Sequence, residues 1–211
     1  MGSLLFLMNL GQDYRMDGAQ DKTFRNQLGT FSLSELDGEK RVIQSAVKGE
    51  SSSFGLLYDY YQPRIYRFVL IKVGRREEAE DLTHQVFLNA WQSIRSYKHH
   101  GFPFSSWLYQ IARNEVIDFY RTRKYEARLD YLDENYFVSP ASAELKFDHG
   151  LEMERVKLAL KQMKPDYQDV IIMRFIEEIP IKEVSLVIGK SEGAVKLIQH
   201  RALKELKKIL S

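Results

Sequence analysis

The chain has 211 residues, of which 44% are hydrophobic and 28% charged, and its formal net charge is +2; this is typical of a protein with one or two globular domains. Its lack of cysteine excludes disulfides, thiolate metal ligands and a cysteine nucleophile, and suits the cytoplasm. No apolar run approaches the roughly 20 residues that cross a bilayer, so we expect no membrane insertion. Because the net charge is so small, any nucleic-acid surface requires local segregation of charge.

Residues 1–36 are expected to be a poorly structured N-terminal extension. Glycines interrupt its short apolar runs, and polar residues fill the gaps between them. The apolar run 4–8 has no cationic segment before it and no small-residue cleavage site after it, so it does not fit a signal peptide. Met16 is an alternative start of translation.

From residue 37 the apolar spacing becomes helical. Asp37 is expected to cap a short helix that ends at Gly49. A longer helix should begin at a cap formed by Ser52 or Ser53, with Pro63 bending or breaking it.

The long helix should close at Gly74, where a glycine can adopt a left-handed conformation. A third helix follows, with acidic residues at its start that suit the positive end of the helix dipole. It is expected to run to Ile94.

The segment 104–124 reads as one amphipathic helix with an aromatic beginning and a basic end. The loop before it, residues 97–103, interleaves aromatic and cationic side chains. Such a pattern is suited to holding unstacked bases and phosphates. Two interpretations remain open from the residues alone: a nucleic-acid contact, or a core helix with a solvated polar face. Trp107 is expected to be a core anchor.

Residues 126–150 are expected to form an acidic linker. They contain six acidic and two basic residues, and the run 139–143 is typical of a linker. This predicts a domain boundary between a first domain, 37–125, and a second domain, 151–211. An acidic surface loop is the alternative.

The second domain carries the pattern of a helix-turn-helix. Pro165 and Pro180 fit the starts of two helices, Gly189 a tight turn, and Ser191 the cap of a final helix. Residues 190–211 contain six basic and two acidic residues, the charge that phosphate contacts need. A generic helical hairpin is the alternative. No strand pattern is found, so the predicted fold is all-α: two small helical domains joined by an acidic linker.

No catalytic motif is present. The sequence lacks HExxH, GxSxG, a phosphate-binding glycine loop and an EF-hand loop, so we expect no enzyme activity and no cofactor. His99 and His100 are adjacent, but without a paired carboxylate they are a weak basis for a metal site. A metal-dependent enzyme is therefore only a third hypothesis, and no metal site is predicted.

Two stretches resemble bacterial sigma factors of the extracytoplasmic function (ECF) group. The sequence AEDLTHQVFLNAW at 79–91, followed by WLYQIARN at 107–114, is similar to the first conserved domain of that group. The sequence SEGAVKLIQHRAL at 191–203 is similar to its second domain. The resemblance covers about residues 39–125 and 151–210, with an acidic segment between them.

The resemblance implies a promoter-recognition subunit of RNA polymerase that acts in the cytoplasm. It would bind the clamp helices of the largest subunit and the flap of the second-largest. It would read the −35 element as duplex DNA, open the −10 element and promote melting. An anti-sigma protein is a further partner that the resemblance implies.

The resemblance also assigns candidate residues to three contacts. The polymerase contact would use Asp81, His84, Gln85, Leu88, Asn89 and Gln92. The −10 contact would use Tyr97, Lys98, His99, His100, Phe102, Arg113, Asn114, Arg121, Arg123 and Lys124. The −35 contact would use Ser191, Glu192, Lys196, Gln199, His200 and Arg201.

Some positions depart from the family pattern. His84 stands where the family commonly has Gln, and Gln85 where it has an acid. The helix from Pro165 lacks a usual arginine, and the turn 177–180 lacks a usual glycine.

The runner-up function is a helix-turn-helix regulator whose helical N-terminal domain senses a signal or dimerises.

Overall fold

The computed structural model describes residues 36–98, 101–130 and 151–210, with side chains over 38–98, 101–123 and 155–210. Every regular element within these ranges is a helix, which confirms the predicted all-α class. The predicted extension up to residue 35, most of the acidic linker, and His99 and His100 lie outside the described residues.

The first helical group comprises four α-helices and one short 3₁₀ turn. Their bounds are α3 Leu36–Val47, α4 Ser51–Val73, α5 Arg76–Ser93, η1 Ile94–Ser96 and α6 Phe104–Asp130. The central helix, α4, packs against α3, α5 and α6. Its buried Leu57, Ile65 and Phe68 lie on one side, and the ring of Phe68 meets Tyr109 of α6 edge to face. This group is therefore built around α4.

The second helical group is smaller and is organised by its last helix. Its elements are α7 Leu151–Gln162, α8 Pro165–Ile171, the π-helical turn η2 Ile172–Ile176, α9 Ile181–Ile188 and α10 Glu192–Leu210. Helix α10 contacts α7, α8 and α9, and its buried residues are Val195, Ala202 and Leu206. The core spacing of seven and four residues fixes which side of α10 faces outward.

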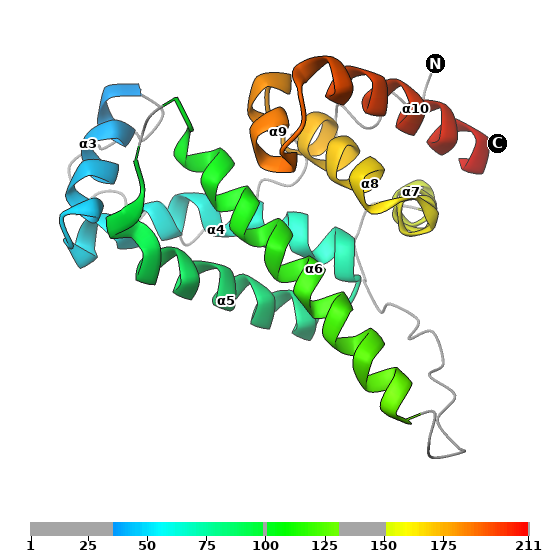
Figure 1. The fold of residues 1–211 in the computed structure, drawn as a ribbon, viewed down its shortest axis with the longest axis horizontal. Helices are drawn as coiled ribbons and strands as arrows, with labels where there is room; N and C mark the ends of the chain where they lie inside the picture. The colour runs from blue at the N-terminus through cyan, green and yellow to red at the C-terminus, as the bar shows by residue number, and fades with distance from the viewer. Residues whose placement is uncertain (1–35, 99–100, 131–150, 211) are drawn as a thin grey trace.

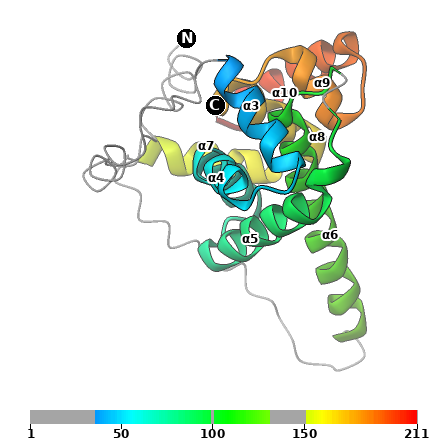
Figure 2. The same cartoon turned by 90° about the vertical axis from the view of Figure 1, so that its left-hand side faces the viewer.

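The two groups lie against each other, with α6 along the boundary (Figure 1). The first half of α6 contacts α9, whereas its last turns extend away from the second group (Figure 2). At another point the side chain of Lys161 on α7 reaches Gly74 at the end of α4. The two groups therefore meet through α4 and α6 on one side and α7, α8 and α9 on the other.

Some predicted helix ends need correction. Helix α4 begins at Ser51 after Glu50, so the cap is neither Ser52 nor Ser53. The Ser53 hydroxyl instead donates to the Glu50 carboxylate at 3.0 Å. Pro63 lies inside α4 without breaking it. Helix α6 continues beyond residue 124 to Asp130.

Other predicted signals are confirmed. Gly74 ends α4 with φ +79°, and its N–H donates to the Leu70 carbonyl at 2.8 Å. Pro165 occupies the first turn of α8. Gly189 ends α9 in the left-handed conformation.

Replacing Gly74 with Ala should lower the free energy of unfolding by about 1–2 kcal/mol, because an L-residue is strained in the left-handed region. The added Cβ would also clash with Lys161 Nζ, which would have to move. Gly55 is the matched control: it lies within α4 with open space around it, so Gly55→Ala should raise stability by about 0.5–1 kcal/mol. Urea unfolding of both variants measures the two effects, and equal destabilisation would contradict this explanation.

Buried tyrosines are a recurrent feature of the first group. Tyr109 is fully buried and Tyr97 nearly so. Burial raises the pKa of Tyr97 to about 12, and it raises the pKa of Tyr109 well above the ordinary value of 10.0. Tyr61 shifts in the same direction because of burial and its hydrogen bond to Glu39. The folded protein therefore holds these phenols neutral.

We expect the chain to lose stability in alkaline solution from about pH 10 upward. A raised pKa in the folded state gives a contribution that is complete below the unfolded value of 10.0 and is lost as pH rises through about 12 for Tyr97. Thermal melting between pH 8 and 12, followed together with tyrosinate absorbance, measures this. Ionisation of all tyrosines near pH 10 without loss of stability would contradict it.

Candidate polymerase and promoter interfaces

The outward side of α5 is polar and largely exposed. Five of the six polymerase candidates are exposed there: Asp81, His84, Gln85, Leu88 and Gln92. The sixth, Asn89, is half-buried; its amide donates to the Glu115 carboxylate of α6 at 2.7 Å and accepts from Gln85 at 3.0 Å. The structure thus brings the six onto one helix face, and their role in binding polymerase stays a prediction.

The loop before α6 is supported by an aromatic cluster. Tyr97 is buried, and its ring lies 5.5 Å from that of Phe104 and 5.1 Å from that of Trp107, centre to centre. Its hydroxyl donates to the Phe102 carbonyl at 2.7 Å. Half-buried Trp107 also packs on Phe104, as expected of a core anchor. Lys98 is exposed.

Tyr97 therefore joins the start of the loop to Phe102 and packs on the first turn of α6. A ring buried against two others must leave that cluster before a base can stack on it. Stacking on a base by Tyr97 stays a prediction, as does the role of the half-buried Phe102.

The basic residues near the end of α6 differ in their surroundings. Arg121 is exposed and pairs with Asp118 at 3.1 Å. Arg123 pairs with Glu78 at 3.1 Å and lies over the Phe119 ring at 5.2 Å. The side chain of Lys124 lies outside the described residues. An exposed pair such as Arg121–Asp118 contributes little stability, so Arg121 can exchange its partner for a phosphate at little cost.

The α9–α10 pair has the geometry of a helix-turn-helix. Gly189 turns the chain with φ +65°. Ser191 then caps α10, since its hydroxyl accepts from the Ala194 N–H at 3.2 Å. The free N–H groups and dipole at this helix start favour an anion such as a DNA phosphate.

The outward side of α10 carries most of the −35 candidates. Glu192, Lys196, His200 and Arg201 are exposed. Gln199 instead lies toward η2, where the Arg174 guanidinium donates to its side-chain oxygen at 3.3 Å. In this arrangement Gln199 is engaged inside the second group, and its contact with a base stays a prediction.

Leu197 is a member of this outward side that sequence reasoning missed. Its side chain is 49% exposed between the cations of α10. The thymine methyl is the apolar group that the major groove presents, and a contact between it and Leu197 is a further prediction. The sequence could have predicted this exposure. Leu197 lies two residues beyond the buried Val195, and a two-residue step places a side chain on the opposite side of a helix.

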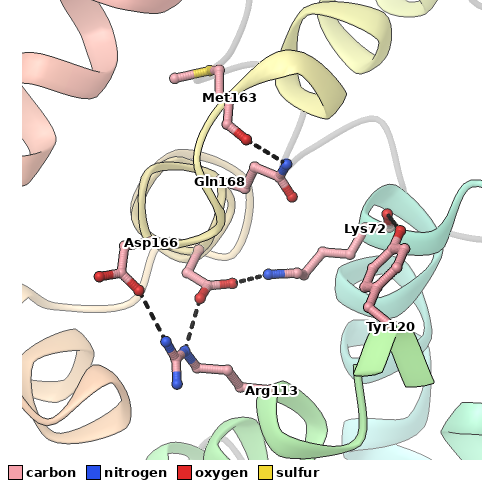
Figure 3. Close-up of polar contacts among 7 residues, drawn as sticks. Lys72, Arg113, Tyr120, Met163, Asp166 and Gln168 are labelled. Atoms are coloured by element: carbon pink, nitrogen blue, oxygen red, sulfur yellow. Dashed lines mark hydrogen bonds and ion pairs between the residues drawn. The ribbon is translucent and has the colours of Figure 1, made fainter. Parts of the chain in front are cut away.

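Arg113 is a −10 candidate that forms two ion pairs with the second group. Its Nε donates to Asp169 Oδ2 at 2.8 Å, and its Nη2 donates to Asp166 Oδ1 at 2.9 Å, both on α8 (Figure 3). Lys72 of α4 approaches the same cluster and forms an ion pair with Asp169. The neighbouring candidate Asn114 is exposed.

This cluster is almost closed to water. The side chain of Asp169 is 1% exposed and that of Lys72 is 3% exposed. Charges this deeply buried are stable only when each has close partners. Removing one partner of a buried ion pair typically costs about 3–5 kcal/mol, so Lys72, Asp169 and Arg113 depend on one another.

A second cluster lies around Glu177, which follows η2. Arg67 donates two parallel hydrogen bonds to the Glu177 carboxylate, at 2.6 and 2.8 Å. The Tyr109 hydroxyl donates to it at 3.0 Å, and Arg64 donates to the Glu177 carbonyl at 2.9 Å. Glu177 thus joins α4 and α6 to the second group.

Sequence reasoning missed these contacts. Arg64 and Arg67 lie on an otherwise apolar and aromatic helix, which was a usable signal that they have specific partners. No local pattern links them to Glu177, more than 100 positions away.

Other types of site find no support. The described side chains include no group of three or more His, Asp and Glu residues that could hold a metal ion. None of the helices in the part of the chain that the structure describes is long and apolar enough to span a membrane.

Comparison with known proteins identifies two matching regions. The family model for sigma-70 region 2 matches residues 57–125, and that for sigma-70 region 4 matches residues 159–208. These matches coincide with the core of the first group and with most of the second.

Sequence relatives agree with these matches. The ECF sigma factor BldN of Streptomyces coelicolor is 33% identical over 80% of this chain, which spans 64% of the BldN length. SigM of Bacillus subtilis is 31% identical over 72% of this chain and 91% of SigM. Both are named ECF RNA polymerase sigma factors.

The fold is shared with solved structures. CnrH, in complex with the cytosolic domain of CnrY, aligns with a TM-score of 0.61 and 24% identity, over 80% of this chain and 94% of that one. RpoE of Bartonella quintana, in complex with the anti-sigma factor NepR, aligns with a TM-score of 0.62 and 22% identity, over 74% and 96%. Both sigma-70 regions are present in order, and BldN and SigM are 33% and 31% identical to the chain. The chain therefore belongs to the ECF group of RNA polymerase sigma factors.

Proposed function

We propose that this sigma factor recruits core RNA polymerase to promoters through two separate DNA contacts. The first group binds polymerase through the outward side of α5 and the −10 element through α6 and the loop before it. The second group binds the −35 element through α10. One observation supports this division of the contacts between the two groups. Exposed polar or basic residues lie on α5 and α6 of the first group and on α10 of the second.

The −35 contact follows from the geometry of α10. Its start offers a capped, anion-binding helix end, and its outward side offers Lys196 and Arg201. Arg or Lys can bind guanine through two acceptors in the major groove, and Glu192 can accept from cytosine. The helix-turn-helix therefore serves to hold duplex DNA and to read it.

The −10 contact follows from α6 and its preceding loop. Basic residues along α6 supply phosphate contacts, and the loop at 97–103 supplies rings and Lys98 beside them. Capturing a flipped base requires a pocket with stacking surfaces. The Tyr97 hydroxyl joins the start of that loop to Phe102.

The setting of this activity follows from its partners. Core polymerase and promoters lie in the bacterial cytoplasm, so the chain acts there as a transcription factor and not as an enzyme. Structural relatives were solved in complex with CnrY and with the anti-sigma factor NepR, and a protein of that kind is a fitting regulator for this chain as well.

Adding the chain to core polymerase should produce open complexes on a subset of promoters from a genomic pool. Permanganate reactivity of unpaired thymines near −10 measures melting. A simple helix-turn-helix regulator would bind duplex DNA without melting it, so binding with no reactive thymine on any promoter would contradict the sigma assignment and favour the regulator.

Replacing Arg201 with Ala should weaken −35-dependent promoter binding by about 1–3 kcal/mol, because a base or phosphate contact is lost. Binding to core polymerase should be unchanged. The control is Arg41→Ala, which removes the same charge from an exposed position on α3. Transcription from promoters with intact and scrambled −35 elements measures the effect, and loss of core binding in Arg201→Ala would refute the assignment of α10.

A further inference from the structure

One side chain of α10, Gln199, is held by the element that precedes the helix-turn-helix. The Arg174 guanidinium donates from Nε to Gln199 Oε1 at 3.3 Å. From Nη1 it also donates to the Ile179 carbonyl. Both Arg174 and Gln199 are half-buried. Arg174 therefore joins Gln199 to the turn between η2 and α9.

Arg174 is itself placed by the backbone around it. It lies in the middle of the π-helical turn η2, and such turns are rare and frequent at functional sites. The Ile179 N–H donates to the Met173 carbonyl at 2.8 Å. Glu178 has φ +56°, a conformation that a residue with a side chain keeps only when its surroundings impose it. The turn that carries the Ile179 carbonyl is therefore well defined, and so is the guanidinium bound to it.

The chemistry of the pair decides which end of the Gln199 amide remains for a base. A guanidinium has N–H donors and no acceptor, so only the amide oxygen can face Arg174. The amide nitrogen, with two N–H donors, then lies on the other edge of the amide group. Gln199 follows Lys196 by three residues and Glu192 by seven, spacings that place it beside these −35 candidates on α10. Its donor end is therefore the end available to DNA.

The choice of a neutral partner for Arg174 is informative. Arg67 and Arg113 also join helices, and both bind carboxylates. A glutamate at position 199 would add the attraction of opposite charges to the same hydrogen bond. It would, however, present only acceptors to a base. Glutamine forgoes that attraction and keeps two donors.

We propose that Arg174 is a positioning residue that makes Gln199 select against cytosine in the −35 element. This inference rests on the proposed function, since it requires α10 to lie in the major groove. There cytosine presents a donor, its N4 amino group, whereas guanine, adenine and thymine each present an acceptor. A donor of Gln199 can bind any of those three bases and is left unpaired against cytosine. Specificity then comes from a mismatch built against the wrong base.

The hydrogen bond from Arg174 is what makes this selection possible. A glutamine amide that is free to turn over can offer its oxygen to the amino group of cytosine as readily as its nitrogen to an acceptor. With the oxygen bound to Arg174, turning the amide over would bring two sets of N–H donors together. Arg174 therefore acts through Gln199, by fixing the direction of its amide.

Binding of holoenzyme to a promoter library randomised over the −35 element tests the proposal. The library is built on a promoter that the wild-type holoenzyme opens, and sequencing of the bound fraction gives the base preference at each position. The wild type should disfavour cytosine about tenfold at one position, because a donor there stays unpaired. Gln199→Ala should largely abolish this discrimination at that position. Gln199→Glu should make cytosine the favoured base there, since glutamate accepts from its amino group.

Arg174→Met should act at the same position of the −35 element. It should weaken the discrimination against cytosine about threefold or more, because a freely turning amide tolerates every base, and should leave the preferences at other positions unchanged. A purely structural role would instead lower binding to all sequences alike. The matched control is Arg155→Met, which removes an exposed arginine that donates to the Leu210 carbonyl of α10 at 3.1 Å. Its base preferences should equal those of the wild type.

The two Gln199 variants keep the test decisive if Arg174→Met does not fold, since they leave Arg174 in place. Unchanged cytosine discrimination at every position in Gln199→Ala would overturn the proposal. So would the absence of a gain for cytosine in Gln199→Glu, or an equal loss for all sequences in a folded Arg174→Met. A wild type without any −35 preference, together with no effect of Arg201→Ala, would instead refute the proposed function.

Discussion

The ion pairs of Asp169 are the interaction on which the described arrangement depends. One carboxylate holds Lys72 of α4 and Arg113 of α6 at once, and the three side chains are nearly or largely closed to water. Attraction between charges is strong in such surroundings, but each charge also costs desolvation energy. The cluster therefore fixes how the two groups sit relative to each other more than it adds stability. It does so at the helix to which the proposed function assigns the −10 contact.

Helix α6 has two roles that follow from one amphipathic sequence. Its apolar side, with Leu108, Ala112 and Val116, packs into the first group. Its polar side supplies Arg113 to the second group in the free chain and, under the proposed function, to DNA on the polymerase. The same side chain cannot serve both partners at once, so the proposed −10 contact of Arg113 requires it to leave Asp166 and Asp169.

Sequence predicted the elements well and the contact between them poorly. Spacing of apolar residues, Gly74, Gly189 and the Ser191 cap located the helices, because these signals are local. The error at the start of α4 arose because serine is a favoured cap, whereas the helix begins earlier, at Ser51, with Glu50 at the cap position. The partners of Arg113 and Glu177 lie 53 or more positions away, and only the folded chain brings them together. Likewise, spacing predicted an exposed basic side of α10, but it did not reveal that Gln199 is held by Arg174.

The central claim is that the carboxylates of Asp169 and Glu177 hold the two groups against each other. The absence of cysteine allows spin labels at two introduced cysteines, Arg75→Cys after α4 and Gln162→Cys at the end of α7. Both positions are exposed and lie next to the point where Lys161 reaches Gly74. Pulsed electron resonance should give one short distance for the labelled chain and a longer or broader distribution when Asp169→Asn and Glu177→Gln are added. The same short distance in both proteins would contradict the account.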